Sequence, residues 1–596
     1  DSINNKLPYL QFEDNLEPTQ IPISTVADLL AIESSSRRLF GAGTADAVIA
    51  SGGLSKIYYL VNDIDFSGSN GGAAYSQSII DGVFKGQLLG NGYTISNLEI
   101  NAPNTKEIGL FSRIDGATIE NLTLSSINIY GEEEVGGIVG QLIGPMNLSN
   151  VAVNGTVSSI DGEVGGIIGL IYTFSENANI HITQASVNAS IIGRTEVGGF
   201  IGDADNFDTL QIFNSTMAGM VTGTSEQVGG FIGEIDRGTV TLSSVTNEST
   251  LSGTDHVGGL IGDHAADHLF ILNSFNSGDV DGEDEVGGLI GKVNHSNATI
   301  TITQSNVHAT VSGVTEIGGF IGDAESLNTL QIFNSTMAGM VTGTSDQVGG
   351  FIGEIDDGTV MLSNLTNLSS VTGKDLTGGI IGDAQLVGES LTITQSSNQG
   401  AVSGEDRVGG IVGRVGRVEL VINTTYNSGS ITVSVSENKE INSGGIIGYH
   451  SSYVGEDYTY QLIQSFNTGE VSTQSGGLIR AGGLIGRTSD DDFTIRNSYN
   501  QGQVSGASLN DQTSIGGLIG RRANTNSLLI ENSYSIGLIS SISPTDAQAG
   551  GLIGRALTSE DLTITDSYYL DTSAARAFHE TDISDTYAKT QSELLD

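Results

Sequence analysis

Short apolar segments recur along the whole chain at a nearly constant spacing. The most regular is the pentapeptide G-G-[FIL]-[IV]-G, which occurs fourteen times between Gly136 and Gly554, with first glycines 29 to 38 residues apart. A period of this size is typical of a solenoid built from one supersecondary unit. Two further segments follow in each repeat, such as 210–213 and 220–222, both too short for a helix and bounded by turn residues. The pattern predicts an all-β solenoid with about 30 residues and three short strands per coil.

One stretch shows that the repeats arose by copying. Residues 209–223, TLQIFNSTMAGMVTG, recur unchanged at 329–343, an offset of 120 residues that equals four repeats. A solenoid is buried coil against coil and does not need separate cores. We therefore expect one continuous body in spite of the length of 596 residues.

The pentapeptide raises a question about side-chain direction. Successive side chains of a flat strand point to opposite faces, so Phe200 and Ile201 cannot both enter one core unless the chain bends. Either the flanking glycines form a corner and both apolar ladders are buried, or one ladder forms an exposed apolar stripe. The 83 glycines are expected to supply positive-φ corners.

Four segments precede the regular repeats: 21–32 (IPISTVADLLAI), 56–68 (KIYYLVNDIDFSG), 84–100 (FKGQLLGNGYTISNLEI) and 108–124 (IGLFSRIDGATIENLTL). With the repeats that follow, they resemble the entry segment of the GLUG-repeat family of bacterial surface proteins and adhesins, and 567–571 and 587–590 are similar to its closing segment. The resemblance implies a short N-terminal helix and a right-handed parallel β-helix, without implying an activity. The chain departs from the family in lacking tryptophan and in its long insertion at 41–53.

These segments divide the chain into four predicted parts. They are an N-terminal tail (1–20), a capping region (21–107), the GLUG-type solenoid (108–570) and a C-terminal cap or tail (571–596). The tail carries an alternating apolar run of Leu7, Tyr9, Leu10 and Phe12, too short to fold alone. We expect it to add a strand to another subunit and so to form a homo-oligomer.

Composition limits the partners and the cellular location that we expect for the protein. The net charge of −46 disfavours nucleic acid and anionic lipid as partners, and the absence of cysteine removes disulfides and thiolate chemistry. The chain has no apolar run long enough for a membrane helix and no secretory signal after Asp1. With the resemblance, this places the expected location outside the cell, secreted or on its surface.

An acidic edge accompanies ten consecutive repeats. Each has an acid two or three residues before its glycine pair: Glu134, Glu163, Glu196, Glu226, Asp255, Glu285, Glu316, Asp346, Asp375 and Asp406. After the pentapeptide, acids such as Asp203 give way to Arg414, Arg487, Arg521 and Arg555 late in the chain. The edge is either a solvated surface or a set of Ca²⁺ ligands, since Ca²⁺ prefers carboxylate and carbonyl oxygens. No other cofactor is expected.

Other polar residues suggest ladders between coils. Asn-Ser pairs such as Asn214-Ser215 follow the second segment and predict stacked corners. An aromatic residue follows the matching pairs late in the chain, which predicts a ring stack and raises the alternative of a sugar-binding platform: Tyr426, Phe466, Tyr499, Tyr534 and Tyr568. His264 and His268 are a weak candidate for a zinc pair.

Catalytic motifs are missing from the sequence. It contains no G-x-S-x-G, P-loop or H-E-x-x-H, and its charges change gradually over many repeats. We therefore expect a non-catalytic extracellular protein, structural or adhesive, on a cell surface or in a biofilm matrix, with protein subunits or surface glycans as partners. The alternatives are a self-assembling filament or sheath subunit and a polysaccharide-binding or polysaccharide-cleaving β-helix.

Overall fold

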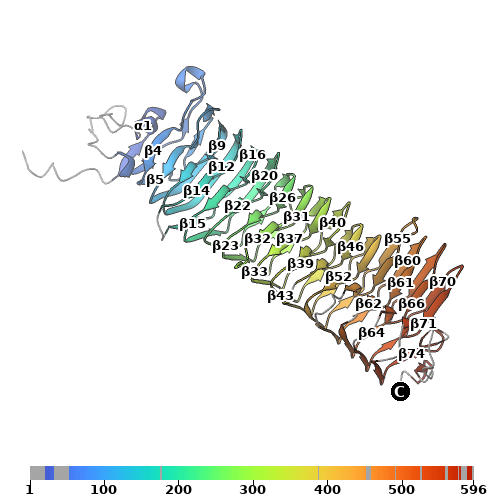
Figure 1. Ribbon diagram of the computed structural model, residues 1–596. Coiled ribbons are helices and arrows are strands. Elements are labelled where there is room, and N and C mark those ends of the chain that lie inside the picture. Colours follow the sequence, from blue (N-terminus) through green and yellow to red (C-terminus); the bar gives the residue numbers. More distant parts are fainter. Residues whose placement is uncertain are drawn as a thin grey trace, which may run out of the picture.

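The computed structural model describes most of the chain as one rod of stacked coils (Figure 1). The described residues are 20–32, 53–174, 178–386, 388–451, 458–489, 491–523, 527–556, 561–574, 576–578 and 587–593. The predicted tail residues Leu7, Tyr9, Leu10 and Phe12, and nearly all of the insertion at 41–53, lie outside them.

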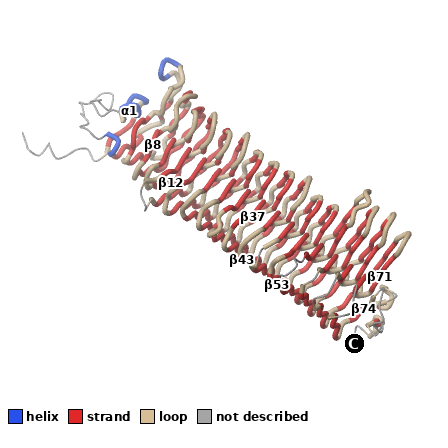
Figure 2. The backbone as a smooth tube through the Cα atoms, viewed as in Figure 1, coloured by secondary structure: helices blue, strands red, loops and turns tan. Residues whose placement is uncertain are grey.

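Three sheets of parallel strands run the length of the rod (Figure 2). The first sheet has 14 strands, the second 16 and the third 45, and neighbouring strands come from successive coils. The chain therefore forms a β-solenoid of about 16 coils with about 31 residues each, and the predicted fold class is confirmed. Among the described residues, no helix is long and apolar enough to cross a membrane.

The first sheet consists of two- to four-residue strands that end on the first glycine of each pentapeptide. They are β10 (Val135–Gly136), β13 (Val164–Gly165), β17 (Val197–Gly198), β21 (Val228–Gly229), β26 (Asp255–Gly258), β31 (Asp284–Gly287), β36 (Thr315–Gly318), β41 (Val348–Gly349), β46 (Asp375–Gly378), β51 (Asp406–Gly409), β56 (Ile441–Gly444), β61 (Ile479–Gly482), β66 (Thr513–Gly516) and β71 (Ala547–Gly550).

In the regular repeats, strands of the second sheet begin on the fourth residue of the pentapeptide. The sheet comprises β4 (Ile80–Phe84), β8 (Phe111–Ile114), β11 (Val139–Leu142), β14 (Ile168–Tyr172), β18 (Ile201–Asp205), β22 (Ile232–Ile235), β27 (Ile261–His264), β32 (Ile290–Asn294), β37 (Ile321–Ser326), β42 (Ile352–Ile355), β47 (Ile381–Ala384), β52 (Val412–Gly416), β57 (Ile447–Ser451), β62 (Ile485–Thr488), β67 (Ile519–Arg522) and β72 (Ile553–Ala556).

The rest of each coil belongs to the third sheet. In one coil, β19 (Thr209–Phe213) and β20 (Thr216–Gly223) flank Asn214, which takes a left-handed φ of 50°. Phe213 and Asn214 both face outward and Ser215 returns to the interior, so the chain bends here. All three predicted apolar segments are present, but they do not correspond to one sheet each. The pentapeptide contributes strands to both the first and the second sheet, and the other two segments both lie in the third sheet.

The pentapeptide forms a corner that buries both apolar ladders. Phe200 and Ile201 are each 0% exposed, as are Phe231 and Ile232 in the next coil, and the rings of Phe200 and Phe231 stack 4.4 Å apart. The glycine-corner interpretation is confirmed, and the exposed apolar stripe is wrong. The bend between the first and second sheets lets adjacent side chains point into the same core.

Close backbone approach explains the three glycines of the motif. A Cβ on Gly198 would lie 1.7 Å from the oxygen of Ile201, and one on Gly199 would lie 2.1 Å from the oxygen of Gly230 in the next coil. Among the described residues, no pentapeptide glycine has a positive φ; that conformation is taken mainly by Asn, Gln and Glu. The expectation of positive-φ glycine corners is met at some turns, such as Gly238 and Gly358, but is wrong for the pentapeptide, where side-chain space and not φ selects glycine.

The N-terminal cap continues the same parallel stacking. Strand β1 (Ile21–Ile23) pairs with β2 (Ile57–Leu60), and β2 pairs with β5 (Gln87–Leu89). Helix α1 (Val26–Ala31) begins at Thr25, whose side chain accepts from the Asp28 N–H while the Asp28 side chain accepts from the Thr25 N–H. This six-residue helix matches the one implied by the family resemblance.

Polar ladders line part of the interior. Asn214 and Asn273 take left-handed φ angles, and each backbone N–H of Ser465, Ser498 and Ser533 donates to the Ser hydroxyl of the next coil, which confirms the stacked Asn-Ser corners. A second ladder of fully buried amides lies two residues after this position, with side-chain bonds of 2.7 to 2.9 Å between successive members: Asn398, Asn427, Asn467 and Asn500. Sequence reasoning missed this ladder, although the recurring [ST]-x-N spacing marks it.

Candidate functional site

Two columns of polar side chains run along the glycine corner. The corner column is the residue that precedes the Val-Gly strand of the first sheet: Glu134, Glu163, Glu196, Gln227, His256, Glu285, Glu316, Gln347, Leu376 and Arg407, all at left-handed φ. The strand column stacks in register in the second sheet: Gln141, Leu170, Asp203, Glu234, Asp263, Lys292, Asp323, Glu354, Asp383, Arg414, Tyr449, Arg487, Arg521 and Arg555. Contacts between Lys292 and Glu285, and between Gln347 and Glu354, show that the columns lie side by side.

The structure divides the ten acids of the predicted edge between two positions. Five belong to the corner column: Glu134, Glu163, Glu196, Glu285 and Glu316. The other five lie one residue earlier: Glu226, Asp255, Asp346, Asp375 and Asp406. Because one residue along a strand reverses the side-chain direction, the ten do not form a single ladder. The acids that face each other across the corner are those of the corner and strand columns.

Burial makes the acidic half of these columns reluctant to ionise. Desolvation first, and neighbouring carboxylates second, raise the pKa of Glu134 to about 7, of Glu234 to about 8 and of Asp323 to about 9. Buried oxygens of Glu134, Glu163, Asp203 and Asp323 have no hydrogen-bond partner among the described residues. Several of these carboxyl groups therefore tend to hold their protons near neutral pH, and ionising them would require a nearby cation.

Two cations relieve the acidic half locally. His256 contacts Asp263 at 3.3 Å and Glu285 at 2.5 Å, and Lys292 contacts the other oxygen of Glu285 at 2.7 Å. Burial opposes the charged imidazole, but its hydrogen bonds to Asp263 and Glu285 prevail and raise the pKa of His256 to about 10. Sequence reasoning overlooked both residues because it followed the acids alone.

The columns change sign after Asp383. Arg414 binds this fully buried carboxylate through two parallel bonds, with Nε 2.8 Å from Oδ1. Arg487, Arg521 and Arg555 then stack in three successive coils. Burial and the two neighbouring guanidinium groups lower the pKa of Arg521. The structure thus aligns the acids and arginines noted in the sequence on one continuous line along the rod.

The late aromatic residues form a continuous ring stack. Successive rings of Tyr426, Phe466, Tyr499 and Tyr534 are 4.8 to 5.0 Å apart and within 2° of parallel. Their faces cover one another, so the predicted stack is confirmed for these four residues. Tyr568 follows Tyr534 in register, and the Lys589 ammonium lies over its ring, 5.0 Å from the centroid. A platform that offers ring faces to sugars is not formed by these residues.

The histidine pair does not converge. His264 points into the core and is 0% exposed, and burial lowers its pKa to about 4. His268 is exposed at the start of β28 (His268–Leu272). Because the two side chains lie on opposite sides of the coil wall, they do not form the suggested zinc pair.

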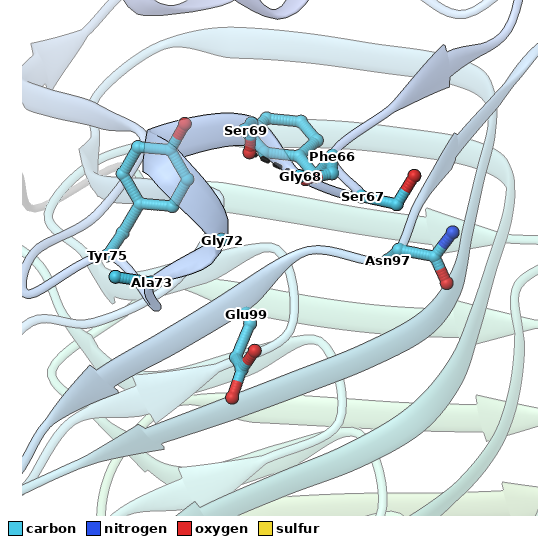
Figure 3. A pocket seen from close by; sticks show the side chains of 9 residues that line it. All are labelled: Phe66, Ser67, Gly68, Ser69, Gly72, Ala73, Tyr75, Asn97 and Glu99. Atoms are coloured by element: carbon cyan, nitrogen blue, oxygen red, sulfur yellow. Dashed lines mark hydrogen bonds between the residues drawn. The ribbon is translucent and has the colours of Figure 1, made fainter.

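A small pocket lies in the N-terminal cap (Figure 3). Its lining includes Phe66, Tyr75, Asn97 and Glu99, and the Ser69 hydroxyl donates to the Phe66 oxygen at 2.6 Å. The Asp65 carboxylate beneath this loop accepts from Asn97 at 2.9 Å and from the backbone and hydroxyl of Ser67. Asp65 is therefore engaged in holding the loop, and the lining itself contains a single carboxylate.

The three acids Glu285, Glu316 and Asp323 converge in the described part of the chain, and we call them the acidic cluster. One carboxylate oxygen from each lies within 4.8 Å of the others. Oxygen-only ligand sets of this kind suit Ca²⁺ or Mg²⁺. Three members of the predicted Ca²⁺ edge or its neighbouring column are thus brought together.

Parts of the chain are similar to known proteins. Residues 58–155 match the model of the N-terminal region of M26 IgA1-specific metallo-endopeptidases. Halomucin of Haloquadratum walsbyi is 30% identical over 255 residues, which cover 37% of this chain and 2% of halomucin. The immunoglobulin A1 proteases of Streptococcus sanguinis and Streptococcus pneumoniae are 27% and 28% identical over 198 and 219 residues. These alignments cover 31% and 33% of this chain, and 10% and 9% of the two proteases.

No solved structure matches the chain. The matches contradict the expectation of a non-catalytic protein that is not an enzyme, because the family model describes a region of metallo-endopeptidases and the streptococcal relatives are immunoglobulin A1 proteases. The absence of catalytic motifs could not reveal this, since the chain spans no more than a tenth of these relatives' length. The chain is therefore similar to parts of large proteins that include immunoglobulin A1 proteases and a halomucin.

Proposed function

We propose that this chain is a rigid rod of an extracellular surface protein, of the GLUG-repeat type, which spaces and presents contact surfaces away from the cell. The observation that carries the proposal is the unbroken second sheet, in which 16 parallel strands from β4 to β72 stack in one direction. With neighbouring strands about 4.8 Å apart, this sheet extends roughly 70 Å. A rod of this length, with one sheet continuous over the described strands, can hold a binding or catalytic region at a fixed distance.

The surface properties support a location outside the cell. A net charge of −46 keeps such a rod soluble and separate from anionic membranes. The similarity to immunoglobulin A1 proteases adds to this, because immunoglobulins are secreted proteins and a protease directed at them meets its substrate outside the cell.

An antibody against residues 108–570 tests the location. Intact cells that produce the protein should be labelled in flow cytometry, and mild treatment with an added protease should remove the label. Labelling that needs cell lysis would overturn the proposal. Negative-stain electron microscopy of the purified chain should show single rods of uniform length, whereas continuous fibres would favour the filament alternative.

A second candidate function rests on the family match at residues 58–155, from β2 into β12 (Met146–Ser159). In this hypothesis the rod is the N-terminal scaffold of an IgA1-directed protease and engages the antibody. The chain should then bind immobilised human IgA1 in surface plasmon resonance and should bind IgG at least tenfold more weakly. Equal binding to both, or to neither, would remove the hypothesis; cleavage followed on gels would show whether this chain also carries activity.

A further inference from the structure

The acidic cluster contains a buried carboxylate oxygen that lacks a partner. Asp323 is 4% exposed, and its Oδ1 is buried without a hydrogen-bond partner among the described residues. Glu285 and Glu316 approach it from two adjacent coils, because Val286 pairs with Ile317 in the first sheet. A buried carboxyl group without a partner either stays protonated or binds a cation, and here two further carboxylates within 4.8 Å supply the remaining ligands that a cation needs.

The side chains nearby do not supply that partner. Lys292 bonds to Glu285 at 2.7 Å and to Glu325 at 3.0 Å, and His256 bonds to Glu285 and Asp263. Both cations therefore make their bonds on the Glu285 side of the cluster, although Lys292 is also the neighbour of Asp323 in the strand column. Within the described residues, no ion pair reaches Glu316 or Asp323, and Glu354 adds a further acid next to Asp323 in the strand column.

We propose that the acidic cluster binds one calcium ion, with Glu316 and Asp323 as its principal ligands and Glu285 as the third carboxylate. Ca²⁺ accepts six to eight oxygens in flexible geometry. This flexibility suits a site in which Glu285 and Glu316 come from the corner column of adjacent coils and Asp323 comes from the strand column. Mg²⁺ demands a near-ideal octahedron and gives up its water reluctantly, so it fits this cluster less well. Lys292 can keep its bond to Glu325 when Glu285 turns to the ion.

The internal duplication supplies a matched control. The offset of 120 residues relates Glu316 and Asp323 to Glu196 and Asp203, which occupy the same columns four coils earlier. The strand column holds Leu170 before Asp203, where Lys292 precedes Asp323. The earlier acids do not form a group as tight as the acidic cluster in the described structure. Asp203→Asn should therefore leave the calcium site intact.

Isothermal titration calorimetry of the full chain with CaCl₂, at constant ionic strength, tests the proposal. The wild type should bind one ion, and Asp323→Asn and Glu316→Gln should each weaken binding at least tenfold. Asp203→Asn should bind as the wild type does. Lys292→Gln should bind several-fold more tightly, because it removes the ammonium group that competes for Glu285.

Thermal unfolding of the same variants separates calcium binding from folding defects, because the shift that each salt causes is compared within one variant. CaCl₂ should raise the midpoint of the wild type and of Lys292→Gln more than MgCl₂ at equal ionic strength, and should act on Asp323→Asn no more than MgCl₂ does. Equal effects of the two salts on the wild type would reveal simple screening and overturn the proposal. Unchanged calcium affinity in Asp323→Asn or Glu316→Gln, or unchanged affinity in Lys292→Gln, would also overturn it.

Discussion

At the scale of single residues, two requirements determine which residues the coil accepts: the small space between neighbouring backbones and the need to pair buried polar groups. The second glycine of the pentapeptide lies so close to the coil above that any side chain would meet backbone, as at Gly199 and the oxygen of Gly230. The buried amide of Asn427 donates to Asn467 in one neighbouring coil and accepts from Asn398 in the other. Asn427 also donates to the Gly429 oxygen of its own coil at 2.8 Å, so the amide both fixes its own turn and links it to the neighbouring coils.

Gly199→Ala should destabilise the rod by about 3 kcal/mol, because overpacking against backbone cannot relax without separating two coils. Its Cβ would lie 2.1 Å from the Gly230 oxygen and 2.7 Å from the Met217 sulfur. Gly162→Ala is the control, since its nearest neighbour is the Thr195 hydroxyl at 3.1 Å. Denaturant unfolding should show a large fall in midpoint for Gly199→Ala alone; similar midpoints would contradict the corner geometry.

Asn427→Ala should cost about 3 kcal/mol, because it leaves the amide groups of Asn398 and Asn467 buried with one partner fewer. Asn427 itself is 0% exposed. The exposed Asn438→Ala provides the comparison and should change the unfolding midpoint little. If the two variants unfold together, the amide ladder contributes nothing to stability.

At the scale of strands, the glycine corner arranges charge in lines. Each coil adds one side chain to the corner column and one to the strand column, so like charges accumulate over successive coils. The acidic half includes Glu134, Glu234 and Glu354, whose pKa values burial raises to about 7, 8 and 8. The later half offers Arg414, paired to Asp383, and the arginine stack that follows it.

The acidic half should make stability fall as pH rises from about 4.5 to about 8. The ordinary pKa of glutamate is 4.5 and the folded rod raises that of Glu234 to about 8, so over this range the folded state holds protons that the unfolded chain has released. Denaturant midpoints at pH 5 and pH 8 measure the effect. Glu234→Gln should reduce the difference between them, while the exposed Glu283→Gln should not; a midpoint that rises with pH would contradict the charge lines.

Much of the fold could be predicted from the sequence. The fourteen pentapeptides specify the coil, and the conflict between Phe200 and Ile201 already required a bend. The sequence did not reveal which acids share a column. An acid two residues before the glycine pair lies in the corner column, whereas an acid three residues before it points in a different direction. The covered faces of the Tyr426 stack were also out of reach, since ring orientation depends on the neighbouring coil.

At the scale of the molecule, stability is shared between neighbouring coils. Every strand of the first two sheets pairs with the equivalent strand one coil away, and these pairings are parallel throughout. A solenoid of this kind has no central residue on which the whole fold depends. Register between coils, rather than total length, is what the sequence must preserve.

Removal of one complete coil should therefore be tolerated. Deletion of residues 201–231 joins Phe200 to Ile232 and restores an intact GGFIG pentapeptide. Ile232 begins the strand of the second sheet that is equivalent to the one beginning at Ile201. Circular dichroism should show an intact β-rich fold that unfolds cooperatively. Deletion of residues 201–215 removes half a coil and shifts every later strand out of phase, so it should unfold or aggregate; equal behaviour of the two deletions would contradict stability through nearest neighbours.

The exact copy of residues 209–223 at 329–343 has a genetic consequence. Unequal recombination between two such stretches removes or inserts 120 residues at a time, which is four coils and about 20 Å of rod. Each product stays in phase, so the lineage can lengthen or shorten the molecule in fixed steps without passing through a misfolded intermediate. The reach of the rod can therefore change by whole coils while the surface chemistry of the remaining coils stays the same.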